Sequence, residues 1–380
     1  MEIKNLKKAG QIILKAIKNK ERIIIYGDTD LDGTTSVILL QEAIKSLGGN
    51  VAAVYFPDRD VEGYGINKTG LNYLKKYSPA LLITVDFGIS NYKEVNLAKK
   101  MGFRVVIIDH HEVLSKIPQA ETVVDPKQKG DKYPFKGLSA AGVVFRLSEI
   151  LFKDKMSEAL KNNFLELTAL STIADMMPRE SENIFFIEEG MASLKKSFRP
   201  AAKVFFEGDY FGDSPDFNQR VFKFISVLNA RDVKSGLPAS FRLLTAPSSE
   251  EAKNIIEELL IKNKIRREEI EKTVEEIEEK SLKRKESIIF AGDIDFDSAL
   301  LSSVASILSQ KHKKPTFLFR KMAKESQGTI RTPKDVNSLV LLKKCSKYLL
   351  SFGGHAQASG FRVKNKDLEN FKKCLIKNFR

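Results

Sequence analysis

The first 110 residues of the chain alternate four short apolar runs with segments whose apolar residues recur at helical spacing. The runs are Arg22–Tyr26, Val51–Phe56, Ala80–Val85 and Phe103–Ile108, and the segments between them lie around residues 34–47, 68–77 and 90–101. Short apolar runs separated by helices are typical of parallel strands that are buried on both faces. The alternation therefore predicts an α/β fold built on a parallel, doubly wound sheet.

Acidic residues and histidines directly follow three of these four runs. They are Asp28, Asp30 and Asp32 after the first run, Asp86 after the third, and Asp109, His110 and His111 after the fourth. Ligand sites in doubly wound sheets lie at the carboxyl ends of the strands, so we expect these side chains to converge. Carboxylate oxygens and imidazole nitrogens are common ligands of divalent cations. The pattern therefore predicts a metal site at this edge of the sheet.

The rest of the chain divides into a helical region and a second region of mixed pattern. Residues 139–200 are mainly helical, and their apolar stretch Phe164–Ile173 ends just before Asp175. Residues 249–285 predict a long helix, with Ser248 and Glu251 as a candidate capping box at its start. From Glu286 the pattern predicts strands at Ser287–Phe290, Pro315–Phe319 and Gly328–Arg331, with a helix near 297–311. We therefore expect a smaller second α/β domain.

The composition indicates a globular protein with a polyanionic partner. Apolar residues make up 42% of the 380 residues, and the formal net charge is +14. Such an excess of positive charge suits nucleic acid, although a generally lysine-rich composition accounts for it equally well. No run approaches the roughly 20 apolar residues of a membrane span. The first twenty residues predict an amphipathic helix rather than a signal peptide.

The chain has two cysteines, Cys345 and Cys374, and both lie far from the histidines in the sequence. Two isolated cysteines predict neither a disulfide framework nor a zinc site. We therefore expect a reducing cytoplasm as the location.

Several segments of the chain, taken together, resemble the DHH phosphoesterase family, and most closely its RecJ branch. The matching segments are YGDTDLDGTTS, PDRDVEGYGI, VDFGIS, IDHHE, VDPKQKGDKYPFKGLSAAGVVFRL and ALSTIADMMP, in family order across residues 23–178. FGGHAQASGF at 352–361 and the strand around Gly328–Thr332 resemble the DHHA1 domain. The resemblance implies a DHH catalytic domain at 1–195, a helical linker region at 196–285 and a DHHA1 substrate-binding domain at 286–380.

The resemblance also implies two Mn²⁺ ions, or Mg²⁺ in their place, and a set of site residues. One ion would be held by Asp28, Asp30 and Asp86, and the other by Asp32, Asp86, His110 and Asp175. Asp109 would orient a ligand, and His111 would contact the scissile phosphate. Substrate phosphates would be bound by Gly353, Gly354, His355 and Arg331 in the second domain, and by Asn229 and Arg231 before it.

Two segments depart from the RecJ pattern. Leu228–Val233 keeps Asn229 but lacks the family's glycine–arginine pair, for which Arg231 is the candidate replacement. Asp295–Ser298 stands where the DHHA1 domain usually has a tryptophan–histidine–proline–glycine run. Nineteen residues follow Phe361, so we expect no OB-fold of the kind that binds single strands in bacterial RecJ proteins.

The leading hypothesis is a 5′–3′ single-strand DNA exonuclease that acts in DNA repair, recombination or replication. RNA or short oligonucleotides are alternative substrates. A second hypothesis is an oligoribonuclease or a phosphodiesterase for linear or cyclic dinucleotides. A third is a replisome scaffold that resembles the Cdc45 relatives of the family and binds a GINS-like partner. No membrane partner is expected.

Overall fold

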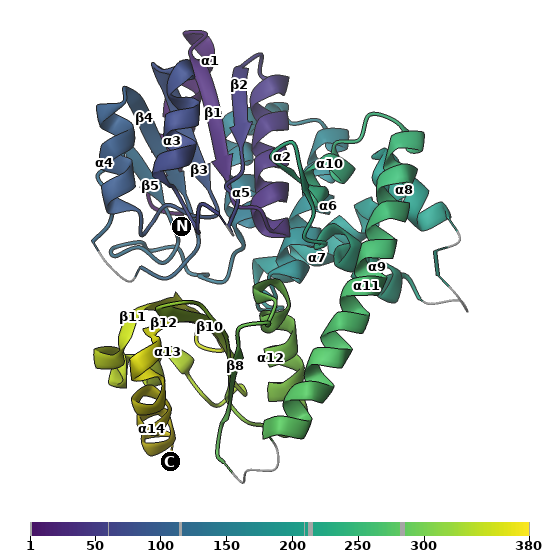
Figure 1. The fold of residues 1–380 in the computed structure, drawn as a ribbon. Helices are drawn as coiled ribbons and strands as arrows, with labels where there is room; N and C mark the ends of the chain where they lie inside the picture. Colours follow the sequence, from purple (N-terminus) through teal and green to yellow (C-terminus); the bar gives the residue numbers. More distant parts are fainter. Residues whose placement is uncertain are drawn as a thin grey trace. The chain divides into compact units, whose positions relative to one another are not determined.

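The chain folds into two compact units, residues Met1–Leu260 and Ile261–Arg380, each built around its own five-stranded sheet (Figure 1). The computed structural model describes residues 2–59, 61–113, 116–208, 210–211, 216–281 and 286–379. A long helix, α11 (Ser249–Ser281), begins in the first unit and ends in the second. No helix in these described ranges is long and apolar enough to cross a membrane.

The first sheet is parallel throughout and has the strand order β2-β1-β3-β4-β5. Its strands are β1 (Arg22–Gly27), β2 (Asn50–Tyr55), β3 (Ala80–Val85), β4 (Phe103–Ile108) and β5 (Thr122–Val124). The four predicted apolar runs form β1 to β4, and the predicted α/β fold with a parallel, doubly wound sheet is confirmed. The sequence pattern does not predict β5, because three residues are too short a run to stand out.

Helices cover both faces of this sheet because successive side chains of a strand point to opposite faces. The helices are α1 (Leu6–Lys18), α2 (Leu31–Ser46), α3 (Lys68–Leu74), α4 (Tyr92–Lys100) and α5 (Ala140–Phe152). Ile23 and Ile25 of β1 pack into one core with α1, α2 and α5. Ile24 and Tyr26, which alternate with them, pack into a second core with α3 and α4. Both faces of the sheet are therefore covered by helices, which leaves the carboxyl ends of its strands as the place for a binding site.

The remaining elements of the first unit are mainly helical. They are α6 (Glu158–Ala174), α7 (Glu182–Leu194), α8 (Pro200–Glu207), α9 (Phe217–Leu228), α10 (Ala239–Leu244), the short strands β6 (Val233–Lys234) and β7 (Leu237–Pro238), and the 3-10 turns η1 (Lys75–Tyr77) and η2 (Lys153–Lys155). Phe205, Phe224 and Leu259 share one hydrophobic core with the first sheet. The division into three domains at 1–195, 196–285 and 286–380 remains a prediction. In the structure, residues up to Leu260 belong to the first compact unit.

The start of α11 shows half of the predicted capping box. The Glu251 amide donates to the Ser248 hydroxyl over 3.2 Å, which satisfies one of the free N–H groups at the helix start. The predicted helix extends to residue 285, and its last four positions, 282–285, lie outside the described residues.

The second unit is a mixed sheet with the strand order β11-β12-β10-β9-β8. Its elements are β8 (Ile289–Asp293), α12 (Ser298–His312), β9 (Thr316–Lys321), β10 (Glu325–Arg331), α13 (Ser338–Lys344), η3 (Ser346–Tyr348), β11 (Leu349–Gly354), β12 (Ala358–Lys364), η4 (Asn365–Asp367) and α14 (Leu368–Asn378). Phe317, Phe361 and Phe371 lie in its main core. The second α/β domain is confirmed, and β11 and β12 are strands that the apolar pattern does not predict.

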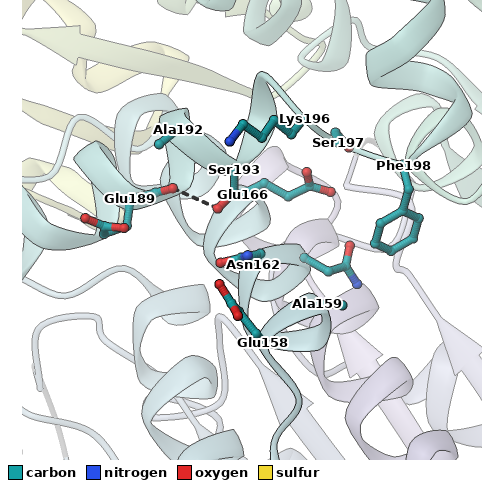
Figure 2. Close-up of a pocket in the computed structure, with 11 residues that line it drawn as sticks. Glu158, Ala159, Asn162, Glu166, Glu189, Ala192, Ser193, Lys196, Ser197 and Phe198 are labelled. Carbon is teal, nitrogen blue, oxygen red and sulfur yellow. Dashed lines mark hydrogen bonds between the residues drawn. The ribbon is translucent and has the colours of Figure 1, made fainter.

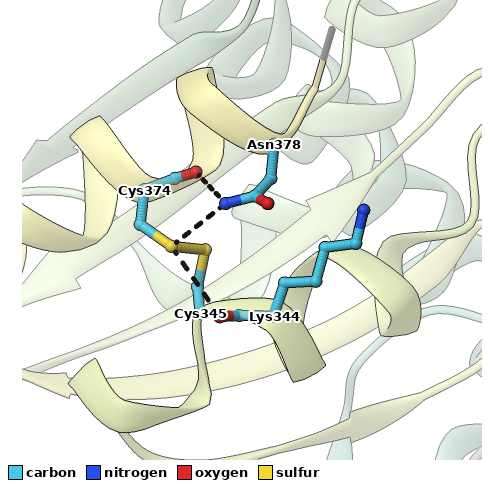
Figure 3. Close-up of a disulfide and its surroundings, with 4 residues drawn as sticks. All are labelled: Lys344, Cys345, Cys374 and Asn378. Carbon is cyan, nitrogen blue, oxygen red and sulfur yellow. Dashed lines mark hydrogen bonds between the residues drawn. A yellow bond between two sulfur atoms is a disulfide. The ribbon is translucent and has the colours of Figure 1, made fainter.

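A disulfide joins Cys345, just after α13, to Cys374 on α14 (Figure 3). The Asn378 amide group donates to the Cys374 carbonyl over 2.9 Å and so fixes the end of α14 beside the disulfide. The sequence pattern does not predict this disulfide. The two cysteines meet because β11 and β12 form a hairpin that returns the chain to α13, a long-range pairing that the spacing of two cysteines does not reveal.

Reducing this disulfide is expected to lower the stability of the second unit by about 3 kcal/mol, because the closed loop restricts the unfolded chain. The cysteines are separated by 29 positions, and the loop between them includes β11 and β12. Hydrogen exchange of the β11 and β12 amides, with and without a dithiol reductant, measures the change. The Cys345→Ala/Cys374→Ala variant serves as the control and should not respond to the dithiol. Equal protection of the wild type in both conditions contradicts the prediction.

Candidate metal centre

The carboxyl ends of β1, β3 and β4 lie side by side and supply the first part of the site. Asp28 follows β1, Asp86 follows β3, and Asp109 and His110 follow β4. These four residues are each at most 2% exposed. Asp86 has a φ of +66°, a left-handed conformation that glycine, asparagine and aspartate adopt more often than other residues. The strand order thus places buried carboxylates and an imidazole at one edge.

The turn from β1 into α2 adds two further aspartates. Asp30 is the N-cap of α2, and its carboxylate accepts from the Gly33 amide over 3.0 Å. A Cβ at Gly33 would lie 2.5 Å from the Asp28 carbonyl oxygen, so this tight turn requires glycine. Asp32 lies in the first turn of α2 and is 3% exposed. Three aspartates at alternate positions therefore remain close together despite the change from strand to helix.

Asp32 also connects α2 to α5 and α6. Its carboxylate accepts from the Ala140 and Ala141 amides at the start of α5, over 2.8 and 2.9 Å. The Ser171 hydroxyl on α6 donates to Asp32 over 2.6 Å. Burial nevertheless raises the pKa of Asp32 to about 6, because these donors only partly offset the loss of water around the carboxylate. The Asp32 carboxylate is thus fixed in position by protein donors.

His110 faces three of the carboxylates through one ring nitrogen. Its Nε2 lies 3.2 Å from Asp86 Oδ1, 3.5 Å from Asp32 Oδ2 and 3.7 Å from Asp175 Oδ2, where Asp175 is the C-cap of α6. The other nitrogen, Nδ1, lies 3.0 Å from the Leu138 carbonyl oxygen. A proton on Nδ1 donates to that carbonyl and leaves Nε2 as a lone pair, the form in which histidine binds metals.

The site fits divalent cations. Asp28, Asp30 and Asp86 form one group of candidate ligands, and Asp32, His110 and Asp175 form another, each with ligand atoms within 4.8 Å of one another. Asp86 Oδ1 and Asp175 Oδ2 are buried, and no hydrogen-bond donor of the described residues reaches them. Burial, and then the neighbouring carboxylates, raise the pKa of Asp86 well above its usual range and that of Asp175 to about 8. Cations would relieve this repulsion.

Asp109 contacts His111 rather than facing the metal ligands. Its Oδ1 accepts from His111 Nδ1 over 2.8 Å, and its Oδ2 accepts from the Ile89 amide over 2.9 Å. Burial disfavours a charged His111, but the Asp109 carboxylate outweighs burial and raises the pKa of His111 to about 9. His111 Nε2 lies 3.4 Å from the Tyr64 hydroxyl. The pair therefore presents a protonated imidazole at neutral pH.

Replacing Asp109 by asparagine is expected to lower the pKa of His111 from about 9 towards the usual value of about 6.5, because the negative charge that stabilises the imidazolium is lost. A pH titration of the His111 ring resonances by NMR in EDTA measures this directly. The ring resonance of His312, which pairs with Glu278 over 2.6 Å, is the internal reference. An unchanged His111 titration contradicts the assignment of Asp109 as its partner.

The structure also brings Arg59 and Tyr64 to the site, two side chains that the sequence pattern does not single out. Both lie in the segment that follows β2, and Arg59 contacts Asp28 and Asp30. The Tyr64 hydroxyl donates to the Asp86 carbonyl over 3.3 Å. The segment PDRDVEGYGI identifies the region, but the direction of its side chains depends on how the loop folds back over β1 and β3.

Asn229 and Arg231 lie at the end of α9 in the first unit, and both are exposed. Asn229 is the C-cap of that helix. The neighbouring Asp232 forms an ion pair with Arg242, which fixes the chain directly after Arg231. Both predicted phosphate-binding side chains are therefore accessible to solvent.

The other predicted phosphate-binding residues lie together at one end of the second sheet. β10 ends at Arg331, which is paired in register with Ala358 at the start of β12. His355 lies in the turn between β11 and β12, where its amide donates to the Ala358 carbonyl over 2.7 Å. Gly354, which precedes it, has a φ of +129°, and a Cβ there would lie 2.5 Å from the Ala358 carbonyl oxygen. The turn therefore requires glycine at this position.

Arg331 is held by neutral groups. Its Nε donates to the Ser306 hydroxyl over 3.1 Å, and its Nη1 donates to the Thr329 hydroxyl over 3.0 Å. Burial lowers the pKa of Arg331, and no carboxylate among the described residues forms an ion pair with it. A partly buried guanidinium with only neutral partners can bind an anion such as a phosphate.

A separate hollow of about 390 Å³ lies among the helices of the first unit (Figure 2). Residues of α6, α7 and the segment before α8 line it, with Glu158, Glu166 and Glu189 as its carboxylates. No residue predicted as a site residue lines it. Glu166 Oε1 accepts from Arg199 Nε over 2.8 Å, so its buried charge already has a partner within the protein. We assign this hollow no role in the chemistry.

Comparison with known proteins gives matches over most of the chain. The N-terminal domain of the DHH family matches residues 22–172, and the DHHA1 domain matches residues 285–380. The single-stranded-DNA-specific exonuclease RecJ of Bacillus subtilis (strain 168) is 31% identical over 382 residues, which are 98% of this chain and 48% of that protein. The RecJ of Escherichia coli (strain K12) is 26% identical over 97% of this chain and 68% of that protein.

A solved structure shows the same fold. The crystal structure of an exonuclease RecJ bound to manganese has a TM-score of 0.80 and 26% sequence identity, and the match covers 99% of this chain and 94% of that one. The chain thus spans about half the length of the Bacillus subtilis relative but nearly all of this crystallised protein.

Proposed function

The chain belongs to the DHH family with an associated DHHA1 domain, and from this membership we propose that it is a metal-dependent phosphodiesterase that hydrolyses single-stranded DNA. The observation that carries the proposal is that two groups of candidate ligands meet at Asp86. Asp86 belongs to the group with Asp28 and Asp30, and its Oδ1 lies 3.2 Å from Nε2 of His110, which belongs to the group with Asp32 and Asp175. The proposed ligands are Asp28, Asp30 and Asp86 for one ion, and Asp32, Asp86, His110 and Asp175 for the other, with Mn²⁺ or Mg²⁺ as the metal.

When bound, two such ions supply an activated water and stabilise the charge that develops on a phosphodiester during hydrolysis. His111 is proposed to donate a proton or hydrogen bond to the scissile phosphate, since Asp109 holds its imidazole in the charged form. Asp109 is a positioning residue that fixes the His111 ring. Arg331, Gly353, Gly354 and His355 are proposed to bind phosphates of the substrate, and Asn229 and Arg231 are proposed to assist.

Single-stranded DNA is proposed as the substrate on two grounds. The relatives are named as single-stranded-DNA-specific exonucleases, and the chain carries a net charge of +14. Contacts to phosphates and stacking on bases are largely independent of sequence, so we expect little base preference. We further propose 5′–3′ polarity and a role in DNA repair, recombination or replication. A cytoplasmic location and a GINS-like or other replisome partner remain predictions.

The test uses purified protein, Mn²⁺ and single strands of about 30 nucleotides labelled at the 5′ or the 3′ end. We expect a ladder of products that EDTA abolishes, and release of the 5′ label as the first product. A blunt duplex of the same sequence is the matched control and should be resistant. Turnover of dinucleotides alone rejects the single-strand substrate, and binding of DNA without cleavage favours the scaffold hypothesis.

A further inference from the structure

Arg59 makes a forked contact with two of the proposed metal ligands. Its Nε lies 2.7 Å from Asp28 Oδ1, and its Nη2 lies 2.5 Å from Asp28 Oδ2 and 2.8 Å from Asp30 Oδ2. A planar guanidinium that binds a carboxylate through two nitrogens is among the stronger ion pairs in proteins. A side-chain cation therefore holds the same carboxylates that one of the two metal ions would use.

The guanidinium places its positive charge beside both carboxylates. Asp28 is 1% exposed, so protein groups rather than water must offset its negative charge, whereas the Asp30 side chain is 44% exposed. Arg59 thus holds the position beside this pair that a metal cation would otherwise take.

No guanidinium holds the second group of ligands. Among the described residues, no lysine or arginine forms an ion pair with Asp32, Asp86 or Asp175. His111 Nδ1 lies 3.9 Å from Asp86 Oδ1, a carboxylate that both ion positions share, and it already pairs with Asp109 over 2.8 Å. The two candidate ion positions therefore differ in one respect. An ion at Asp28 and Asp30 must displace a guanidinium, and an ion at Asp32, His110 and Asp175 need not.

The loop that carries Arg59 is anchored independently of the guanidinium. Glu62 accepts from the Tyr55 hydroxyl over 2.9 Å and from the Asn67 side chain over 3.0 Å. The Tyr64 ring lies 5.5 Å from Arg59 Cζ and offers an aromatic surface beside the guanidinium. Arg59 can therefore leave the carboxylates by rotating its side chain while the loop stays in place.

We propose that Arg59 is an internal counter-cation that competes with metal for Asp28 and Asp30, so that the two ions bind in order. The ion at Asp32, His110 and Asp175 binds first and more tightly. The ion at Asp28, Asp30 and Asp86 binds second, as Arg59 leaves. This inference rests on the two-metal site of the proposed function and adds to it a residue that sets the affinity of one ion.

The test is a Mn²⁺ titration followed by calorimetry and by the electron paramagnetic resonance of free Mn²⁺. The wild type should show two classes of site. In Arg59→Gln the weaker class should tighten about tenfold, while the tighter class changes less than about twofold, because the competing charge acts on one position alone. Arg59→Lys keeps a charge but not the fork, and its weaker class should fall between the two.

Arg104→Gln is the matched control. Arg104 belongs to the same unit and pairs with Glu21 and Glu121, so its replacement removes the same charge away from Asp28 and Asp30. Its Mn²⁺ affinities should equal those of the wild type. Two Mn²⁺ sites whose affinities are unchanged or weaker in Arg59→Gln overturn the proposal and leave the proposed function standing. A wild type that binds no Mn²⁺ overturns both.

Discussion

Replacement of Asp86 by asparagine is expected to reduce Mn²⁺-dependent cleavage of single-stranded DNA by about a thousandfold or more, equivalent to roughly 4 kcal/mol in the activation free energy. Asp86 is the carboxylate that the two proposed ion positions share, so its loss affects both at once. Asparagine keeps the shape of the side chain and tolerates the left-handed backbone at this position, where φ is +66°. The variant should therefore fold and lose function through its ligand alone.

Single-turnover cleavage at saturating Mn²⁺ measures the effect, and a Mn²⁺ titration of the same sample shows whether ions are lost. Asp154→Asn removes an exposed carboxylate of the same unit and should cleave at the wild-type rate. A variant at Asp86 that binds two Mn²⁺ ions and cleaves within about tenfold of the wild type contradicts the proposed ligand set.

Replacement of Arg199 by methionine is expected to lower the free energy of unfolding by about 3–5 kcal/mol, because it leaves the buried Glu166 carboxylate without its charged partner. Arg199 is 5% exposed and donates to Glu166, to Glu42 and to the Leu244 carbonyl, over 2.8, 3.0 and 3.0 Å. Methionine fills a similar volume and supplies none of these contacts. The lower free energy of unfolding should appear in urea unfolding, and the substitution should leave the metal ligands unchanged.

The pH dependence of this deficit identifies its cause. Burial raises the pKa of Glu166 from 4.5 to about 7 even with Arg199 present, and removing Arg199 raises it further. A carboxyl group whose pKa is higher in the folded state costs stability as the pH rises through that value. The deficit should therefore be larger near pH 8 than near pH 5, and Glu166→Gln in the Arg199→Met background should remove the difference. Equal deficits at both pH values assign the loss to packing instead.

Arg104→Met is the control for this comparison. Arg104 pairs with Glu21 and Glu121 at distances similar to those of Arg199, but its side chain is 38% exposed. Solvent screening reduces the value of such a pair to about 1 kcal/mol or less. The contrast between the two arginines separates burial from the mere presence of an ion pair.

The sequence is most informative for site residues that follow buried strands. Asp28, Asp86 and His110 could be placed together because each directly follows a run of apolar residues, and parallel strands end at one edge. Asp175 could be included through the family resemblance, since its position at the end of α6 depends on how that helix packs. The fold class was predictable for the same reason, as β1, β3 and β4 are strongly apolar.

The sequence is least informative where contacts depend on long-range packing or on side-chain direction. β11 is largely exposed, so it lacks the apolar pattern that marks the strands of the first sheet. The Cys345–Cys374 disulfide forms only because β11 and β12 return the chain to α13. Arg59 lies in a loop, and no apolar pattern indicates that its guanidinium reaches Asp28 and Asp30.

The hydrogen bonds of Asp32 have a consequence for how the protein is handled and how it responds to changing ion supply. Amides of α5 and a hydroxyl of α6 hold this carboxylate in place, so the packing of three helices does not depend on a bound ion. Chelation should therefore give a folded apoprotein that regains activity when ions return, unlike domains that metal binding folds. A preformed site of this kind exchanges its ions without refolding, so the ion it carries in a cell follows from the concentrations of the competing metals.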